Sequence, residues 1–229
     1  MDIPLTEYEQ PRSIHELCDW INSKLHALEQ FADFEERYFE RRGQHIKKLL
    51  EEAIPIAKLG LYFWRPWRDI SVVCLAGNQA YDATMILHDP HQSETIHIEV
   101  TSTETDETTM RRQALSRDGS VFMLGPVRRQ GRQILSEATM VDLDAEHTRL
   151  MECAFARFQS KAEQESDSQT AILVYVSTPQ SLPLHYRAQL LEQTHVYLRT
   201  NSPTLYGAYY CYHNDYGTDG LRNNIYELR

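Results

Sequence analysis

Apolar residues recur at helical spacing in the first third of the chain. A Ser-x-x-Glu capping box begins at Ser13, and the apolar positions 14, 17, 21, 25 and 28 that follow predict an amphipathic helix ending near Phe31. A second, charged helix is expected over residues 34–59, where Gly43 and Pro55 interrupt the pattern and favour a bend. Two consecutive helices of this kind predict an N-terminal helical hairpin.

The middle of the chain changes to the alternating pattern of β-strands. Runs rich in β-branched and apolar residues at 70–75, 81–87 and 95–102 are separated by Gly-Asn and Asp-Pro turns, and they predict a three-stranded meander. In the third run, the apolar positions 96, 98 and 100 alternate strictly with the polar residues His97, Glu99 and Thr101. The polar and apolar sets therefore point to opposite faces of the sheet.

The rest of the chain mixes both patterns. Further helices are expected over 105–116, 143–164 and 183–198, and further strands over 171–176, 206–212 and 224–228. The run at 171–176 is continuously apolar, as in a strand buried on both faces. This order predicts an α/β fold, with α+β as the alternative, in which helices flank a mixed central sheet. We expect residues 1–33 to form a helical appendage and residues 34–229 a single α/β nuclease-like domain.

Composition narrows the class of protein. With 229 residues, 41% hydrophobic and 24% charged, the chain has an ordinary globular composition. A formal net charge of −10 argues against a protein that coats nucleic acid mainly through phosphate contacts, although it allows a local basic face. The four cysteines lie far apart and the N-terminus lacks a signal-peptide pattern, so we expect free thiols in a cytoplasmic protein without a membrane segment.

Two acidic residues on neighbouring predicted strands are the first candidates for chemistry. If the strands pair through the Asp-Pro turn, the carboxylates of Asp82 and Glu99 point to the same face of the sheet. Two hard oxygen ligands suit Mg²⁺, which can position and acidify a water for phosphodiester hydrolysis. The alternative is structural, with Asp82 capping the start of a strand and Glu99 on a solvated face.

With Asp82 on the second strand and Glu99 on the third, the chain resembles the PD-(D/E)xK, or restriction-endonuclease-like, nuclease superfamily. The similarity covers roughly residues 35–212 as topology and residues 81–101 as motif. It implies a restriction-endonuclease-like core and a metal-dependent endonuclease or exonuclease acting on DNA or RNA. It also implies that Asp82 and Glu99 hold Mg²⁺.

Thr101 departs from the pattern of the superfamily, which usually has lysine at this position. Threonine cannot supply a positive charge to hold the nucleophilic water or the transition-state phosphate. In some relatives a neighbouring element supplies the missing charge. The candidates near the motif are Lys47, Lys48, Arg111 and Arg112, with Arg111 preferred over the lysines by its proximity in the chain.

Two further roles follow from the resemblance. Gln113 lies on the helix after the motif strand, where several relatives carry a polar residue, and this implies a role in orienting substrate or water. Relatives also often direct a glutamate of the first core helix at the metal, and here Glu36 or Glu40 would fill that role. The alternative is that these glutamates are part of a solvated helix face.

A basic segment follows the candidate motif. Residues 108–133 contain six arginines against one acid, a local charge of +5. They are Arg111, Arg112, Arg117, Arg128, Arg129 and Arg132. Guanidinium groups bind phosphate in a bidentate manner, so the segment is a candidate nucleic-acid-binding surface. The alternative is a solvated basic face that balances the acidic N-terminal half.

Two other classes of function remain open. The chain could keep the fold without catalysis and act as an interaction or regulatory protein, as a homodimer through the N-terminal hairpin and Trp64 and Trp67. A small-ligand site on the tyrosine-rich C-terminal strands is a third alternative. The signature motifs of P-loop ATPases, dinucleotide enzymes, α/β-hydrolases and zincins are absent from the sequence.

Overall fold

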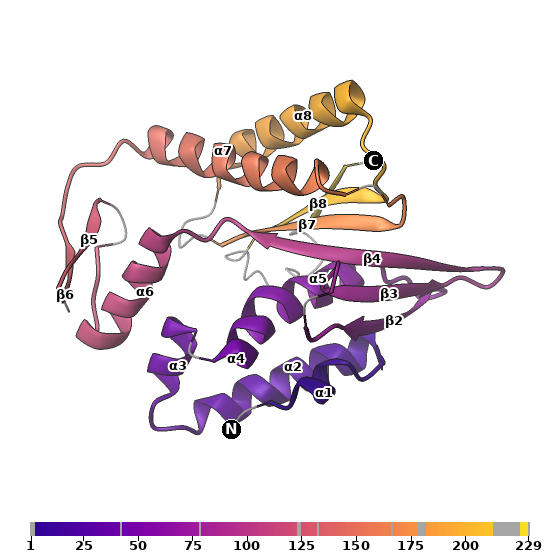
Figure 1. Ribbon diagram of the computed structural model, residues 1–229, viewed down its shortest axis with the longest axis horizontal. Helices are drawn as coiled ribbons and strands as arrows, with labels where there is room; N and C mark the ends of the chain where they lie inside the picture. Colours follow the sequence, from indigo (N-terminus) through magenta and orange to yellow (C-terminus); the bar gives the residue numbers. More distant parts are fainter. Residues whose placement is uncertain are drawn as a thin grey trace.

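The computed structural model describes residues 3–41, 43–77, 79–122, 125–131, 133–165, 167–177, 182–212 and 225–228. Its centre is a seven-stranded mixed sheet, in which helices cover both faces (Figure 1). In spatial order, the strands are β1 (Arg12–Ser13), β2 (Asp69–Cys74), β3 (Ala83–His88), β4 (Ser93–Ser102), β7 (Thr170–Val176), β8 (Gly207–Tyr212) and β9 (Ile225–Leu228). The predicted α/β class with a mixed sheet is therefore confirmed.

The strands β2, β3 and β4 form the predicted antiparallel meander. Strand β7 then runs parallel to β4, and β8 runs parallel to β7. All seven residues of β7 are buried, as the continuous apolar run predicted, because β7 has a paired strand on each side and hydrophobic clusters above and below.

One helical layer comes from the N-terminal part of the chain. It consists of α1 (Leu5–Tyr8), α2 (Ile14–Glu29), α3 (Phe34–Glu40), α4 (Gln44–Lys48), the π-helical turn η1 (Leu49–Ala53) and α5 (Ile54–Phe63). The capping box at Ser13 forms as expected. Buried residues of α2 and α5 share one hydrophobic cluster with β2, β3 and β4. The division of the chain at residue 33 stays a prediction.

The helix expected over residues 34–59 is divided. The backbone turns into the left-handed region at Arg41 (φ 52°) and has a positive φ of 89° at Gly43, so α3 ends there and α4 begins anew. From Gln44 the helix continues through η1 to Phe63. Pro55 has no N–H to donate to the preceding turn and its ring would crowd that turn. The wider π-helical turn just before it accommodates the proline and carries Glu51 and Glu52.

The opposite face of the sheet is covered by α7 (Leu143–Ala162) and α8 (Leu184–Asn201), which pack on β7 and β8 in a second hydrophobic cluster. At one end of the molecule, α6 (Asp106–Asp118) contacts a hairpin formed by β5 (Val127–Gln130) and β6 (Gln133–Ser136) (Figure 1). Among the helices of the described residues, none is both long and apolar enough to cross a lipid bilayer.

Candidate active site

The register of the meander brings Asp82 and Glu99 together. Ala83 pairs with Ile98, and the Asp82 N–H donates a hydrogen bond of 2.8 Å to the Ile98 carbonyl, so Asp82 lies beside the part of β4 that carries Glu99. The Asp82 Oδ2 atom also accepts a hydrogen bond of 2.8 Å from the Val100 N–H. Asp82 is half-buried and Glu99 is buried. The two predicted acids are therefore neighbours at the point where β3 begins.

A lysine that the sequence analysis did not select lies at this pair. Lys161, in the last turn of α7, forms a hydrogen-bonded ion pair with Glu99 Oε1. The contact joins residues 62 positions apart in the chain, which is why proximity to the motif did not reveal it. A helical signal existed, since Lys161 lies three and seven positions after the buried residues Phe158 and Ala154 and thus on the side of α7 that faces the sheet.

Glu52 approaches the pair from the other helical layer. Its carboxylate forms a 2.5 Å ion pair with Lys48, a lysine only 8% exposed. Burial raises the pKa of Glu52, and the negative charge of Asp82 raises this pKa further. We call Glu52, Asp82 and Glu99 the acidic centre. The helical glutamate of the acidic centre is thus Glu52, from η1. Glu40, one of the two helical glutamates that the resemblance implied near the metal, pairs with Arg117 at 3.1 Å.

Burial raises the pKa of each carboxyl group of the acidic centre. Burial raises the pKa of Asp82, although the Val100 N–H and the charges of Lys48 and Lys161 act in the opposite direction. Burial also raises the pKa of Glu99, where the ion pair with Lys161 lowers it and the charge of Asp82 raises it again. The carboxylates are thus costly to ionise in spite of two lysines, and a divalent cation between them would offset that cost.

The number of available carboxylate ligands limits which metal ion the acidic centre could hold. Within the described part of the chain, no group of three or more His, Cys, Asp or Glu side chains is arranged to hold a metal ion. Asp82 and Glu99 alone offer two hard carboxylate ligands. This set fits Mg²⁺, which keeps several waters and is commonly bound by one or two carboxylates plus substrate phosphates. Lys161 would compete with the ion for Glu99.

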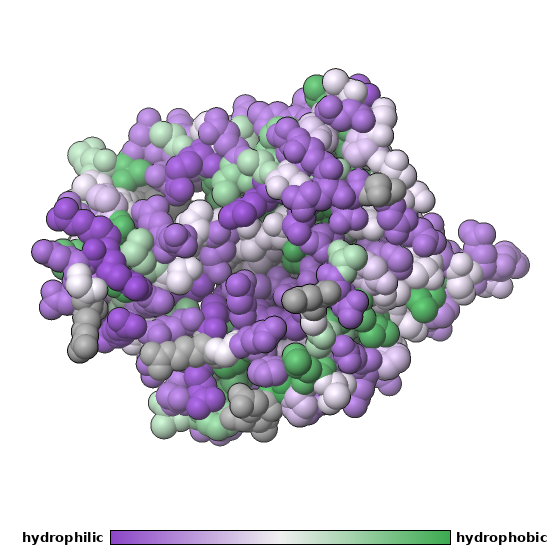
Figure 2. All heavy atoms as spheres, in the orientation of Figure 1, coloured by the Kyte–Doolittle hydropathy of each residue, from purple (hydrophilic) through white to green (hydrophobic). Residues whose placement is uncertain are grey.

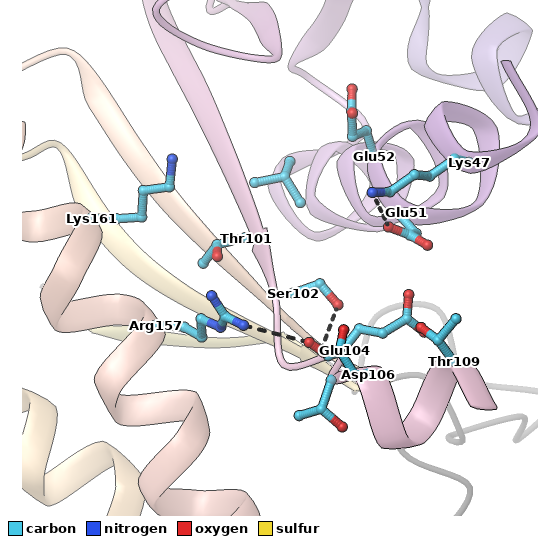
Figure 3. Close-up of a pocket in the computed structure, with 12 residues that line it drawn as sticks. Lys47, Glu51, Glu52, Thr101, Ser102, Glu104, Asp106, Thr109, Arg157 and Lys161 are labelled. Atoms are coloured by element: carbon cyan, nitrogen blue, oxygen red, sulfur yellow. Dashed lines mark hydrogen bonds and ion pairs between the residues drawn. The ribbon is translucent and has the colours of Figure 1, made fainter. Parts of the chain in front are cut away.

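A polar cavity of about 440 Å³ lies beside the acidic centre. Its floor is the end of β4, including Thr101, and its walls come from the helical segment of α4 and η1, from α7 and from the start of α6. Figure 3 shows Lys47 and Glu52 on one side of β4 and Arg157 and Lys161 on the other. Hydrophilic residues gather in the middle of the face drawn in Figure 2, between α7 and α4.

The predicted arginine surface is largely occupied by internal ion pairs. The pairs are Arg111–Glu107 at 2.7 Å, Arg112–Glu104, Arg117–Glu40 at 3.1 Å and Arg128–Glu137 at 2.7 Å. Arg129 donates a 2.7 Å hydrogen bond to the Gln113 side chain, and Arg132 lies outside the described residues. Among the described residues that line the cavity, there is neither Gln113 nor any of these arginines.

The roles of Thr101, Gln113 and these arginines stay predictions. Of the candidates for the missing charge, Lys47 lines the cavity and Lys48 pairs with Glu52, whereas Arg111 and Arg112 are held by glutamates. Comparison with known proteins gives no direct guide to these roles. No protein family matches this sequence, no curated protein matches it, and no solved structure matches its fold.

Proposed function

We propose that this chain is a Mg²⁺-dependent nuclease with a restriction-endonuclease-like core, in which Asp82 and Glu99 hold the metal and Lys161 replaces the lysine missing at Thr101. The observation that carries the proposal is the ion pair between Lys161 and Glu99, next to Asp82. Two carboxylates that can hold a metal ion, with a lysine beside them, form a charge arrangement that can support metal-assisted phosphodiester hydrolysis.

The position of Lys161 agrees with this role. Residues two apart on a strand point to the same face, so a lysine at position 101 would lie on the face that carries Glu99. Lys161 reaches that face from α7, and both Thr101 and Lys161 line the cavity. The helix therefore delivers an ammonium group to the place that the motif strand leaves uncharged.

Each residue has a defined task in the proposed reaction. Mg²⁺, when bound, would lower the pKa of a coordinated water and neutralise charge on the phosphate. Asp82 is oriented for this by the Val100 N–H, which fixes one carboxylate oxygen. Lys161 would hold the attacking water or the negative transition-state phosphate. Glu52, paired with Lys48, would orient a water bound in the acidic centre.

A second candidate function is supported by the ion pairs themselves. Glu99 and Glu52 each already have a lysine partner, which balances part of the charge of the acidic centre without a metal. A protein that had lost catalysis would keep these pairs as structural links between the sheet and its helices, and would serve as an interaction or regulatory protein. The two functions differ in what Lys161 does.

Cleavage of fluorescent single-stranded and duplex oligonucleotides with Mg²⁺ or Mn²⁺ tests the nuclease proposal. We expect Lys161→Met to reduce the rate at least about 100-fold, because it removes a cation that acts in the transition state. The matched control is Arg149→Met, since Arg149 is an exposed cation on the same helix that pairs with Glu146. Full activity of Lys161→Met, or cleavage that survives in Asp82→Asn, would contradict the proposal.

A further inference from the structure

Among the described residues, the cations that line the cavity come from outside segment 108–133. Lys47 reaches the cavity from α4, and Arg157 reaches it from α7. Arg157 and Lys161 are four residues apart, so they lie on one face of α7. Figure 3 shows Lys47 and Arg157 on opposite sides of the end of β4.

The side chains of Lys47 and Arg157 are both available to bind a ligand. The Lys47 side chain is 64% exposed and its Nζ lies 3.9 Å from Glu51 Oε2, near the limit of an ion pair. Arg157 is exposed and makes one long hydrogen bond, 3.5 Å, to the Glu104 carbonyl. Among the ion pairs formed between described residues, Arg157 takes no part. A guanidinium in this state can bind phosphate without first breaking an ion pair.

The shape and charge of the cavity limit what can enter. A volume of about 440 Å³ falls within the range of small-ligand pockets. A duplex, whose major groove alone is about 12 Å wide, is too large for such a space. Glu51, Glu104 and Asp106 also line the walls, so additional phosphates would meet negative charge. Lys47 and Arg157 place positive charge on two sides of this space, where phosphates of one strand could contact them.

We propose that Lys47 and Arg157 bind phosphates of a single, unpaired nucleic-acid strand that enters the cavity beside the acidic centre. The inference rests on the proposed nuclease function and names the form of its substrate. The strand lies between α4 and α7, so that one of its phosphates reaches Lys161 and the acidic centre. Lys47 and Arg157 are positioning residues, because they hold phosphates outside the reacting group.

Fluorescence anisotropy with a labelled oligothymidylate, in EDTA so that no cleavage occurs, tests this binding. We expect Lys47→Gln and Arg157→Gln each to weaken binding about threefold to tenfold and to lower the slope of log affinity against log salt by about 0.7. Arg149→Gln is the control, since this exposed arginine of α7 pairs with Glu146. A blunt duplex of equal length should bind at least about tenfold more weakly than the single strand.

Three results would overturn the inference: equal weakening by Arg149→Gln, unchanged binding in both cavity variants, or a duplex that binds as tightly as the single strand. Failure here is distinguishable from failure of the nuclease proposal. If Lys161-dependent cleavage occurs but Lys47→Gln and Arg157→Gln leave KM unchanged, only this inference fails. If the strand binds through Lys47 and Arg157 and wild-type protein neither binds Mg²⁺ nor cleaves, only the nuclease proposal fails.

Discussion

Asp82 combines a structural cost with a proposed catalytic use. Its carboxyl is half-buried, and burial raises its pKa above the usual range in spite of a backbone hydrogen bond and two nearby lysines. An acid whose pKa is raised by folding contributes stability that is present below its unfolded pKa, about 3.9, and is lost as the pH rises through the folded pKa. Ionisation of Asp82 therefore opposes folding.

Asp82→Asn should for this reason stabilise the metal-free protein at neutral pH. Asparagine keeps an oxygen that accepts the Val100 N–H and removes the charge. We expect a gain on the order of 1 kcal/mol, a rise in Tm of about 2–4 °C for a chain of this size. Thermal melting between pH 4 and pH 8, in EDTA, measures it, and the gain should shrink toward the acidic end. A variant less stable than wild type at pH 8 would contradict this prediction.

Strand β4 and helix α7 each have a position from which a positively charged side chain could enter the same cavity. Thr101 on β4 and Lys161 on α7 line the same cavity. If the ammonium group matters and its element of origin does not, a lysine on the strand should substitute for one on the helix. The exposed fraction of Thr101 is intermediate, so a longer side chain can extend into the cavity.

The double variant Thr101→Lys/Lys161→Met tests this exchange. We expect it to recover about tenfold or more of the cleavage rate lost in Lys161→Met, with the rate measured on the same oligonucleotide. Thr101→Arg in the same background is the geometric control, because a planar guanidinium does not replace a compact ammonium. No recovery by lysine, in a double variant that still melts cooperatively, would show that Lys161 has no transferable catalytic charge.

The same elements show what sequence patterns can predict. The meander and the buried strand β7 were predictable because alternation and continuous hydrophobicity are local signals. The division of the second helix followed from Gly43, a local feature as well. Lys161 and Glu52 were missed because their positions depend on how α7 and η1 pack on the sheet, which no local pattern encodes.

In the whole folded molecule, acidic and basic residues from different segments of the sequence lie side by side. The formal net charge is −10, and the prediction that the strongly basic segment 108–133 binds phosphates stays a prediction. Folding brings acids from outside the segment to four of its six arginines, as with Arg117 and Glu40 on α3. The Arg117–Glu40 pair, together with a hydrogen bond of 2.8 Å from Arg112 to the Phe39 carbonyl, connects α6 to α3.

The proposed homodimer rests on a different surface. Trp64 is half-buried and packs edge-to-face on the exposed His15 with a ring distance of 5.2 Å, so it takes part in the contact between α2 and the segment after α5. Trp67 is 65% exposed and is the aromatic residue that a partner would contact. The dimer stays a prediction from the sequence, and it is independent of the acidic centre.

Calorimetric titration of the whole protein with Mg²⁺ and Mn²⁺ tests directly whether the acidic centre binds a metal ion. We predict binding in wild type that is lost in Asp82→Asn, and tighter binding in Lys161→Met, because the ammonium no longer competes for Glu99. Binding gained and cleavage lost in one variant would separate the metal site from the catalytic charge. Absence of binding in wild type, or equal binding in Asp82→Asn, would contradict the assignment of the acidic centre as a metal site.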